Sequence, residues 1–141
     1  MQQIKKIRTV MVFGTFDIFH QGHENFLQQA KKYGDYLIVV IARDATVKQV
    51  KGDLPDNSEK IRQQAVIKSN LTNEVVLGNL KNKYAIIKRI KPDIICLGYD
   101  QEYFVDQLED EVKKLKLNTK IIRLKPYKAT IYKTSIIKNK I

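Results

Sequence analysis

Cysteine is almost absent from this chain. The one cysteine, Cys96, has no second thiol within the 141 residues with which to form a disulfide. Proteins of reducing compartments typically keep their thiols free, so we expect a cytoplasmic protein. Cys96 falls in an apolar stretch, where we expect it to fill space in the core rather than to act in redox chemistry.

Long apolar runs are missing as well. Hydrophobic residues make up 43% of the chain, which is enough for one core. No apolar stretch approaches the roughly 20 residues that a membrane-spanning helix needs. The first ten residues, MQQIKKIRTV, lack the apolar region of a signal peptide. We therefore expect a single domain over residues 1–141 and no membrane partner.

Several motifs of large enzyme classes do not occur. The G-x-S-x-G of serine hydrolases, the dinucleotide-binding G-x-G-x-x-G and the phosphate-binding pattern that ends in GK[ST] are all absent. A zinc site needs three or four ligands, whereas the chain offers only His20, His23 and the distant Cys96. These residues define no metal site, and the identity of any metal stays open.

Acidic residues are the minority among the charged ones. Lys and Arg number 26 against 15 Asp and Glu, which gives a net charge of +11. Such a charge attracts nucleic acid, anionic lipid or phosphorylated small molecules, but it also fits a lysine-rich surface that only keeps a protein soluble. No helix-turn-helix, zinc finger or RNA-binding aromatic pattern occurs, so we expect no specific nucleic-acid partner. A basic nucleic-acid-binding module is kept as the alternative, with binding that weakens steeply in salt.

Apolar runs and helical patterns alternate along the chain. We expect strands at 8–13, 36–42, 74–78, 92–98 and 119–124, and helices at 22–33, 58–69, 83–90, about 103–116 and, last, 134–141. This alternation predicts the α/β class, with a five-stranded parallel sheet covered by helices on both faces. The expected architecture is a Rossmann-like three-layer α/β/α sandwich.

Three polar segments follow three of the expected strands. Residues 14–23 (GTFDIFHQGH), 42–52 (ARDATVKQVKG) and 98–101 (GYDQ) come after the first, second and fourth strands. Ligands of open parallel sheets bind beyond the carboxyl ends of the strands, so we expect these segments to meet at one edge. Residues 51–57 (KGDLPDN) are expected to form a mobile loop.

Both histidines of the chain lie in the first of these segments. His20 and His23 are one helical turn apart at the start of an expected helix. Gly14 allows close approach of the backbone to a ligand, and Gly22 leaves room for a bulky group. A helix N-terminus suits phosphate, and two imidazoles would add donors to a phosphoryl oxygen. The alternative is that both histidines only cap the helix.

The segment GTFDIFHQGH resembles the GTFD…H-x-G-H signature of the cytidylyltransferase-like nucleotidyltransferases. The segments ARDATVKQVKG and KPDIICLGYDQ, with the helix that carries Arg62, resemble the archaeal FAD synthetase (FMN adenylyltransferase) branch. The related glycerol-3-phosphate cytidylyltransferases typically have a GDDW-like stretch where this chain has GYDQ. The resemblance spans nearly the whole chain.

The resemblance implies a reaction. A nucleoside monophosphate passes from a nucleoside triphosphate to an acceptor phosphate in line, with release of pyrophosphate and no covalent enzyme intermediate. The expected substrates are ATP and FMN, and the alternative pair is CTP with glycerol 3-phosphate or a similar phosphorylated alcohol. Mg²⁺ or another divalent cation would neutralise the triphosphate. The resemblance also implies a homodimer, and an inactive nucleotide-sensing module is a further alternative.

The resemblance also assigns roles to single residues. The catalytic residues that it implies are His20, His23, Lys48 and Arg62. The residues expected on the nucleotide are Gly14, Thr15, Phe16, Gly22, His23, Gly98, Tyr99, Asp100, Thr134 and Ser135. The residues expected near the acceptor are Asp17, which lies near the acceptor or a metal, together with Lys48 and Lys51.

One departure from the family pattern lies near the end of the chain. The family usually has a serine- and threonine-rich motif there, and this chain has Lys133 in place of the first serine. Thr134 and Ser135 keep two hydroxyl groups for triphosphate oxygens. Taken alone, the lysines at 48 and 51 would be solvated loop charges, and Arg62 would be a surface residue of its helix.

Overall fold

The computed structural model describes residues 6–101 and 107–126. The expected last helix at 134–141 lies outside these residues, and so do Lys133, Thr134 and Ser135. The first part of the helix expected at about 103–116 also falls outside them, and the structure has α5 at Leu108–Lys114.

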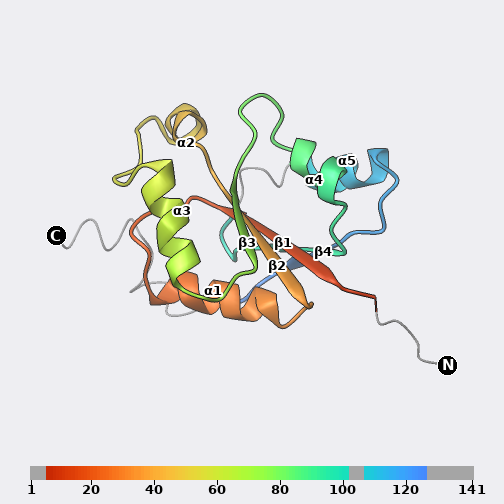
Figure 1. Cartoon of the computed structure of the whole chain (residues 1–141). Helices are drawn as coiled ribbons and strands as arrows, with labels where there is room; N and C mark the ends of the chain where they lie inside the picture. The colour runs from red at the N-terminus through yellow and green to blue at the C-terminus, as the bar shows by residue number, and fades with distance from the viewer. Residues whose placement is uncertain (1–5, 102–106, 127–141) are drawn as a thin grey trace.

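Five strands form one parallel sheet (Figure 1). They are β1 (Thr9–Gly14), β2 (Tyr36–Ile41), β3 (Glu74–Leu77), β4 (Ile94–Leu97) and β5 (Lys120–Arg123), in the spatial order β3-β2-β1-β4-β5. Every neighbouring pair is parallel. The expected five-stranded parallel sheet is therefore confirmed, and no strand bound differs from its expected position by more than two residues.

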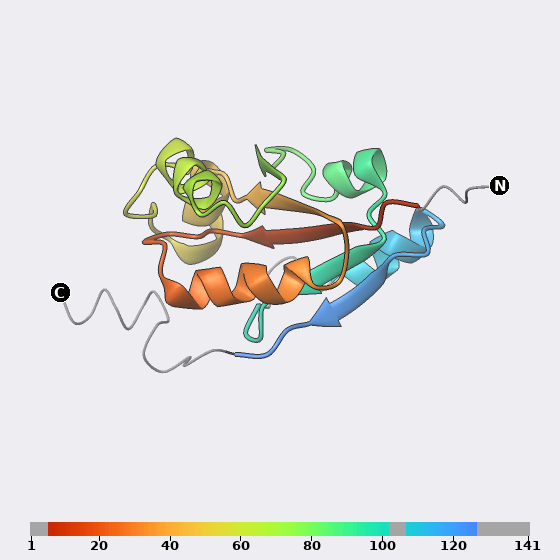
Figure 2. The ribbon, with the colours of Figure 1, turned by 60° about the horizontal axis from the view of Figure 1, so that its bottom comes forward.

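Helices cover both faces of the sheet, as expected for a three-layer α/β/α sandwich. They are α1 (Gln21–Lys31), α2 (Asp44–Lys51), α3 (Glu59–Lys68), α4 (Ala85–Ile90) and α5 (Leu108–Lys114). The side chains of α1 and α3 pack on one face of the sheet, and those of α4 and α5 pack on the other. Figure 2 shows α1 lying along β1.

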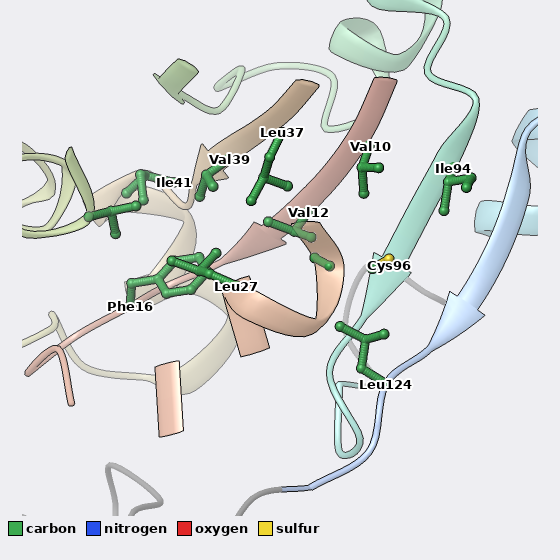
Figure 3. Close-up of a cluster of buried hydrophobic side chains, with 12 residues drawn as sticks. Val10, Val12, Phe16, Leu27, Leu37, Val39, Ile41, Ile94, Cys96 and Leu124 are labelled. Atoms are coloured by element: carbon green, nitrogen blue, oxygen red, sulfur yellow. The ribbon is translucent and has the colours of Figure 1, made fainter. Parts of the chain in front are cut away.

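The central strands are apolar on both faces because side chains alternate along a strand. Val10 and Val12 of β1 belong to the cluster under α1, whereas Met11 and Phe13 belong to the cluster under α4 and α5. Figure 3 shows the first cluster, which includes Cys96. This thiol is fully buried, and burial raises its pKa to about 12, so the expected role as a core residue is confirmed.

The helix α2 corrects an expectation. Residues 42–52 were expected as a loop, but residues 44–51 form a helix that ends at Gly52 in the left-handed conformation, with φ of 89°. Asp44 in the first turn and Lys48 and Lys51 in the last turn match the helix dipole, and the glycine suits the end of a helix. Lys51 therefore belongs to a helix rather than to the loop expected at 51–57.

The strand order places a crossover reversal between β1 and β4. In open parallel sheets a ligand crevice forms at this switch point, outside the carboxyl ends of the two strands. The segment that follows β1 carries both histidines, and the turn at 98–101 follows β4. Among the described residues, no helix is long and apolar enough to cross a membrane.

Candidate active site

The two histidines cap the N-terminus of α1. His20 is the N-cap residue, and its Nδ1 accepts a hydrogen bond from the Gly22 N–H at 3.0 Å. The Nδ1 of His23 accepts from the His20 N–H at 3.2 Å, which completes a reciprocal capping box. The two rings stack with centroids 3.9 Å apart. The capping interpretation is thus confirmed for the Nδ1 atoms.

The same hydrogen bonds determine what the other ring nitrogens offer. Burial lowers the pKa of both histidines. For His23 the neighbouring His20 lowers the pKa further and Asp17 partly opposes this, so that the pKa of His23 falls to about 3. Both rings are therefore neutral at pH 7. A neutral imidazole whose Nδ1 accepts a hydrogen bond carries its proton on Nε2. Capping and phosphate binding thus use different nitrogens, and the two interpretations are compatible.

The backbone of the histidine loop, residues 14–20, adopts unusual conformations. Phe16 and Ile18 have φ values of 53° and 51°, which are strained for residues with a side chain and more so for a β-branched one. A Cβ atom on Gly14 would lie 2.7 Å from the Phe16 ring, so this position requires glycine. The Phe16 ring in turn contacts that of His23, with centroids 5.4 Å apart. Strain and tight packing therefore occur where the histidines are placed.

Asp17 ties the histidine loop to the segment between α2 and α3. Its carboxylate is buried, with Oδ2 accepting from the Asp56 N–H at 2.8 Å and Oδ1 from the Asn57 N–H at 3.0 Å. The end of the segment expected to be a mobile loop is therefore anchored. The role of Asp17 toward an acceptor or a metal stays a prediction, and the structure adds this anchoring role.

Arg62 is not a surface residue, because only 1% of it is exposed. Its guanidinium donates to the carbonyl groups of Thr15 and Asn57 and to the carboxylate of Asp44. The surface interpretation is therefore wrong, and a direct contact of Arg62 with phosphate stays a prediction. Lys48 is exposed on α2, the helix whose first residue is Asp44.

Two residues that the sequence interpretation missed hold the turn at 98–101. Gln101 accepts from the Gly98 N–H at 3.2 Å and donates through Nε2 to the Phe13 carbonyl of β1 at 3.2 Å. Arg123 donates through Nη1 to the carbonyl groups of Gly98 at 2.7 Å and Gln101 at 3.1 Å. The turn is thereby joined to both strands that flank β4.

The signals for these two residues differ. Gln101 lies inside the GYDQ segment itself, so its amide could have been chosen as a turn-forming group. Arg123 lies 22 residues further along the chain, and only the pairing of β4 with β5 reveals its contact. Tyr99 and Asp100 are exposed at the tip of the turn, where a ligand can reach them.

Comparison with known proteins identifies the family. The family described as cytidylyltransferase-like matches residues 11–140, and the chain belongs to this family. The FAD synthase of Thermococcus sibiricus is 43% identical over all of this chain and 96% of its own length. The FAD synthase of Pyrococcus horikoshii is 44% identical over 87% of this chain and 82% of its own. The family resemblance drawn from GTFDIFHQGH is thus confirmed.

A solved structure shows the same fold. The crystal structure described as the lipopolysaccharide core biosynthesis protein from Thermoplasma volcanium superposes with a TM-score of 0.80 at 36% identity. The match covers 86% of this chain and 99% of that chain. The two chains therefore share their overall fold.

Proposed function

We propose that this protein is an FMN adenylyltransferase. A phosphate oxygen of FMN attacks the α-phosphorus of ATP, the bond between that phosphorus and the oxygen leading to the β-phosphate breaks, and pyrophosphate leaves as FAD forms. Curated relatives named FAD synthase, 36–44% identical to this chain, support the choice of substrates. The observation that carries the proposal is the stacked, neutral pair of His20 and His23 at the start of α1.

The two histidines supply donors for the triphosphate. With Nδ1 held by backbone N–H groups, each Nε2–H is the remaining donor of a ring whose orientation is already fixed. Donors that are oriented before the substrate arrives stabilise charge that develops on the phosphoryl oxygens without reorganisation. The N-terminus of α1 adds its partial positive charge beside them.

The other proposed contacts surround this centre. Lys48 and Lys51 of α2 meet the acceptor phosphate or the α-phosphate, since both side chains are exposed beyond the carboxyl end of β2. Gly14, Thr15, Phe16 and Gly22 approach the phosphates and nucleotide through the backbone. Gly98, Tyr99 and Asp100 take the ribose and base, where the exposed Tyr99 ring offers a stacking surface.

The described residues do not fit a protein-held metal ion. No group of three or more His, Cys, Asp or Glu side chains is placed to hold one among residues 6–101 and 107–126. Asp17 is the one carboxylate in residues 14–23, and both of its oxygens accept hydrogen bonds from backbone N–H groups. Mg²⁺ commonly keeps several waters and binds through substrate phosphates, so we propose that it arrives with the triphosphate.

The test is pyrophosphate release across a small matrix of substrates. ATP and CTP are each combined with FMN, glycerol 3-phosphate and phosphocholine in the presence of Mg²⁺, and flavin products are separated by chromatography. We expect release and FAD only with ATP and FMN. His20→Ala is the inactive reference, and Glu24→Gln, an exposed residue of the same helix, is the matched control.

The outcomes separate the alternatives. Release with CTP and a phosphorylated alcohol would move the assignment to a cytidylyltransferase. Release that His20→Ala leaves unchanged would contradict the role proposed for the Nε2 donor of His20. No turnover with any pair, combined with salt-sensitive nucleic-acid binding, would favour the basic binding module instead.

A further inference from the structure

Arg62 joins segments that are far apart in the sequence. Its side chain is fully buried. Nη1 donates to the Thr15 carbonyl at 2.8 Å, and Nε donates to the Asn57 carbonyl at 3.0 Å. The histidine loop and the end of the α2–α3 connection are thus both fixed to the first turn of α3.

Asp44 brings α2 into the same arrangement. Its Oδ1 accepts from Nη2 of Arg62 at 2.7 Å. A guanidinium keeps its charge even when buried, so it needs a counter-charge, and Asp44 provides one. The Asp44 N–H also donates to Oε1 of Glu59 at 2.8 Å, and Oε2 of Glu59 accepts from Nε of Arg43 at 2.9 Å. The first turn of α2 is therefore fixed to α3 at more than one point.

The fixed first turn of α2 determines the position of the two lysines further along the helix. Lys48 and Lys51 come four and seven residues after Asp44, so all three lie on the same side of the helix. The contacts of Asp44 thereby fix the orientation of the helix face that carries the two lysines. Both lysines are exposed, as residues that meet a substrate phosphate must be.

We propose that Asp44 and Arg62 form a positioning pair, which fixes α2 and its two lysines relative to the histidine loop so that the acceptor phosphate and the triphosphate meet in line. This rests on the proposed function, which gives Lys48 and Lys51 their phosphate contacts. Arg62 then acts through the segments that it joins, and Asp44 becomes a determinant of activity that touches no substrate.

The test compares Asp44→Asn in two backgrounds, the wild type and the Lys48→Ala/Lys51→Ala variant, by steady-state FAD formation. The substitution preserves size and removes the counter-charge. Since a misplacement of about 1 Å in a positioned group can cost up to about 100-fold, we expect the KM for FMN to rise about tenfold or more in the wild type. In the Lys48→Ala/Lys51→Ala variant we expect Asp44→Asn to change the KM for FMN by less than about twofold. The reason is that Asp44 is proposed to act only through the position of these two lysines.

Two further variants keep the result interpretable. Asp53→Asn removes an exposed carboxylate two residues beyond α2 and is expected to leave the KM for FMN unchanged. Arg62→Lys keeps the charge, but an ammonium cannot reproduce the planar fork that reaches three acceptors. We expect it to raise the KM for FMN and also to lower the melting temperature, because the ammonium leaves at least one of the buried acceptors of Arg62 without its donor.

Each outcome is decisive. An equal effect of Asp44→Asn in both backgrounds, or an unchanged KM for FMN in Arg62→Lys, would overturn the proposal. If the wild type makes no FAD, the proposed function fails separately, and amide hydrogen exchange then tests the pair. Asp44→Asn should raise exchange in α2 and in residues 14–17 together, and unchanged exchange in either segment would contradict the coupling.

Discussion

The loops on the two sides of the switch point are held in different ways. The histidine loop after β1 has strained residues at Phe16 and Ile18 and a buried carboxylate at Asp17 that binds backbone N–H groups. The turn after β4 is exposed at its tip and is held by two side chains, Gln101 and Arg123. The histidine loop is therefore fixed by its own backbone and by a buried carboxylate, whereas the described contacts of the turn after β4 come from two side chains.

The largest expected effect is the loss of activity in His20→Asn. This substitution separates the two roles of the histidine, which are helix capping and the proposed donation to phosphate. Asparagine is among the best N-cap residues, so the start of α1 should keep its cap and the melting temperature should stay near that of the wild type. The Nε2 donor is lost, and we expect kcat to fall by about 10²- to 10³-fold. Steady-state FAD formation and thermal unfolding measure the two effects. A variant that retains most of its kcat would mean that the histidine acts only as a cap.

Alanine substitutions at Gly14 of the histidine loop and at Gly98 of the turn after β4 compare the packing of these two segments through their effect on stability. A Cβ on Gly14 would meet the buried Phe16 ring at 2.7 Å, whereas a Cβ on Gly98 would have its nearest neighbours at 3.8 Å. We expect Gly14→Ala to lower the free energy of unfolding by about 1–3 kcal/mol, as overpacking usually does. Gly98→Ala should change it little. Urea unfolding of both variants checks this, and equal losses would refute the contrast between the two loops.

The pH dependence of the free energy of unfolding tests the burial of His20 and His23, and it does not involve the turn after β4. Burial lowers the pKa of both histidines in the folded protein, that of His23 to about 3 from its ordinary 6.5. The unfolded chain therefore takes up protons first, and the free energy of unfolding falls as the pH drops from 6.5 toward 3. The loss is at most about 1.4 kcal/mol per pH unit for each histidine. Urea unfolding at several pH values should show a shallower slope in His23→Asn, and an unchanged slope would assign the effect to other groups.

Sequence patterns predicted the sheet well because its central strands, β1, β2 and β4, are apolar on both faces. The run from Tyr36 to Ile41 is typical of a strand that is buried on both faces, and it pairs with β1 over its whole length. The helix α2 escaped prediction because it is short and carries the β-branched residues Thr46, Val47 and Val50, which lower helix propensity. Asp44 and Gly52 are residues typical of the start and the end of a helix, but the sequence pattern around them was interpreted as a loop.

The candidate site was predictable only where residues are close in sequence. The histidines are three residues apart, so their spacing alone placed them together. Arg62 meets Asp44 and Thr15 at separations of 18 and 47 residues, and no local pattern reveals that a charged residue in a polar helix is buried. Long-range hydrogen bonds of this kind depend on the packing of the whole sheet edge.

The smallest expected effect concerns the turn after β4. Arg123→Ala removes the donor to the carbonyl groups of Gly98 and Gln101 but leaves the histidine loop intact. Hydrogen bonds from a charged donor contribute about 1.5–3 kcal/mol each when well formed, and this side chain is exposed, so we expect only about a tenfold rise in the KM for ATP with kcat nearly unchanged. Lys120→Ala, an exposed cation on the same strand, is the matched control and should leave both constants as they are. If kcat fell as strongly as in His20→Asn, the turn would take part in positioning the reacting phosphates, and the two loops would form one preorganised unit rather than a rigid side and an adaptable one.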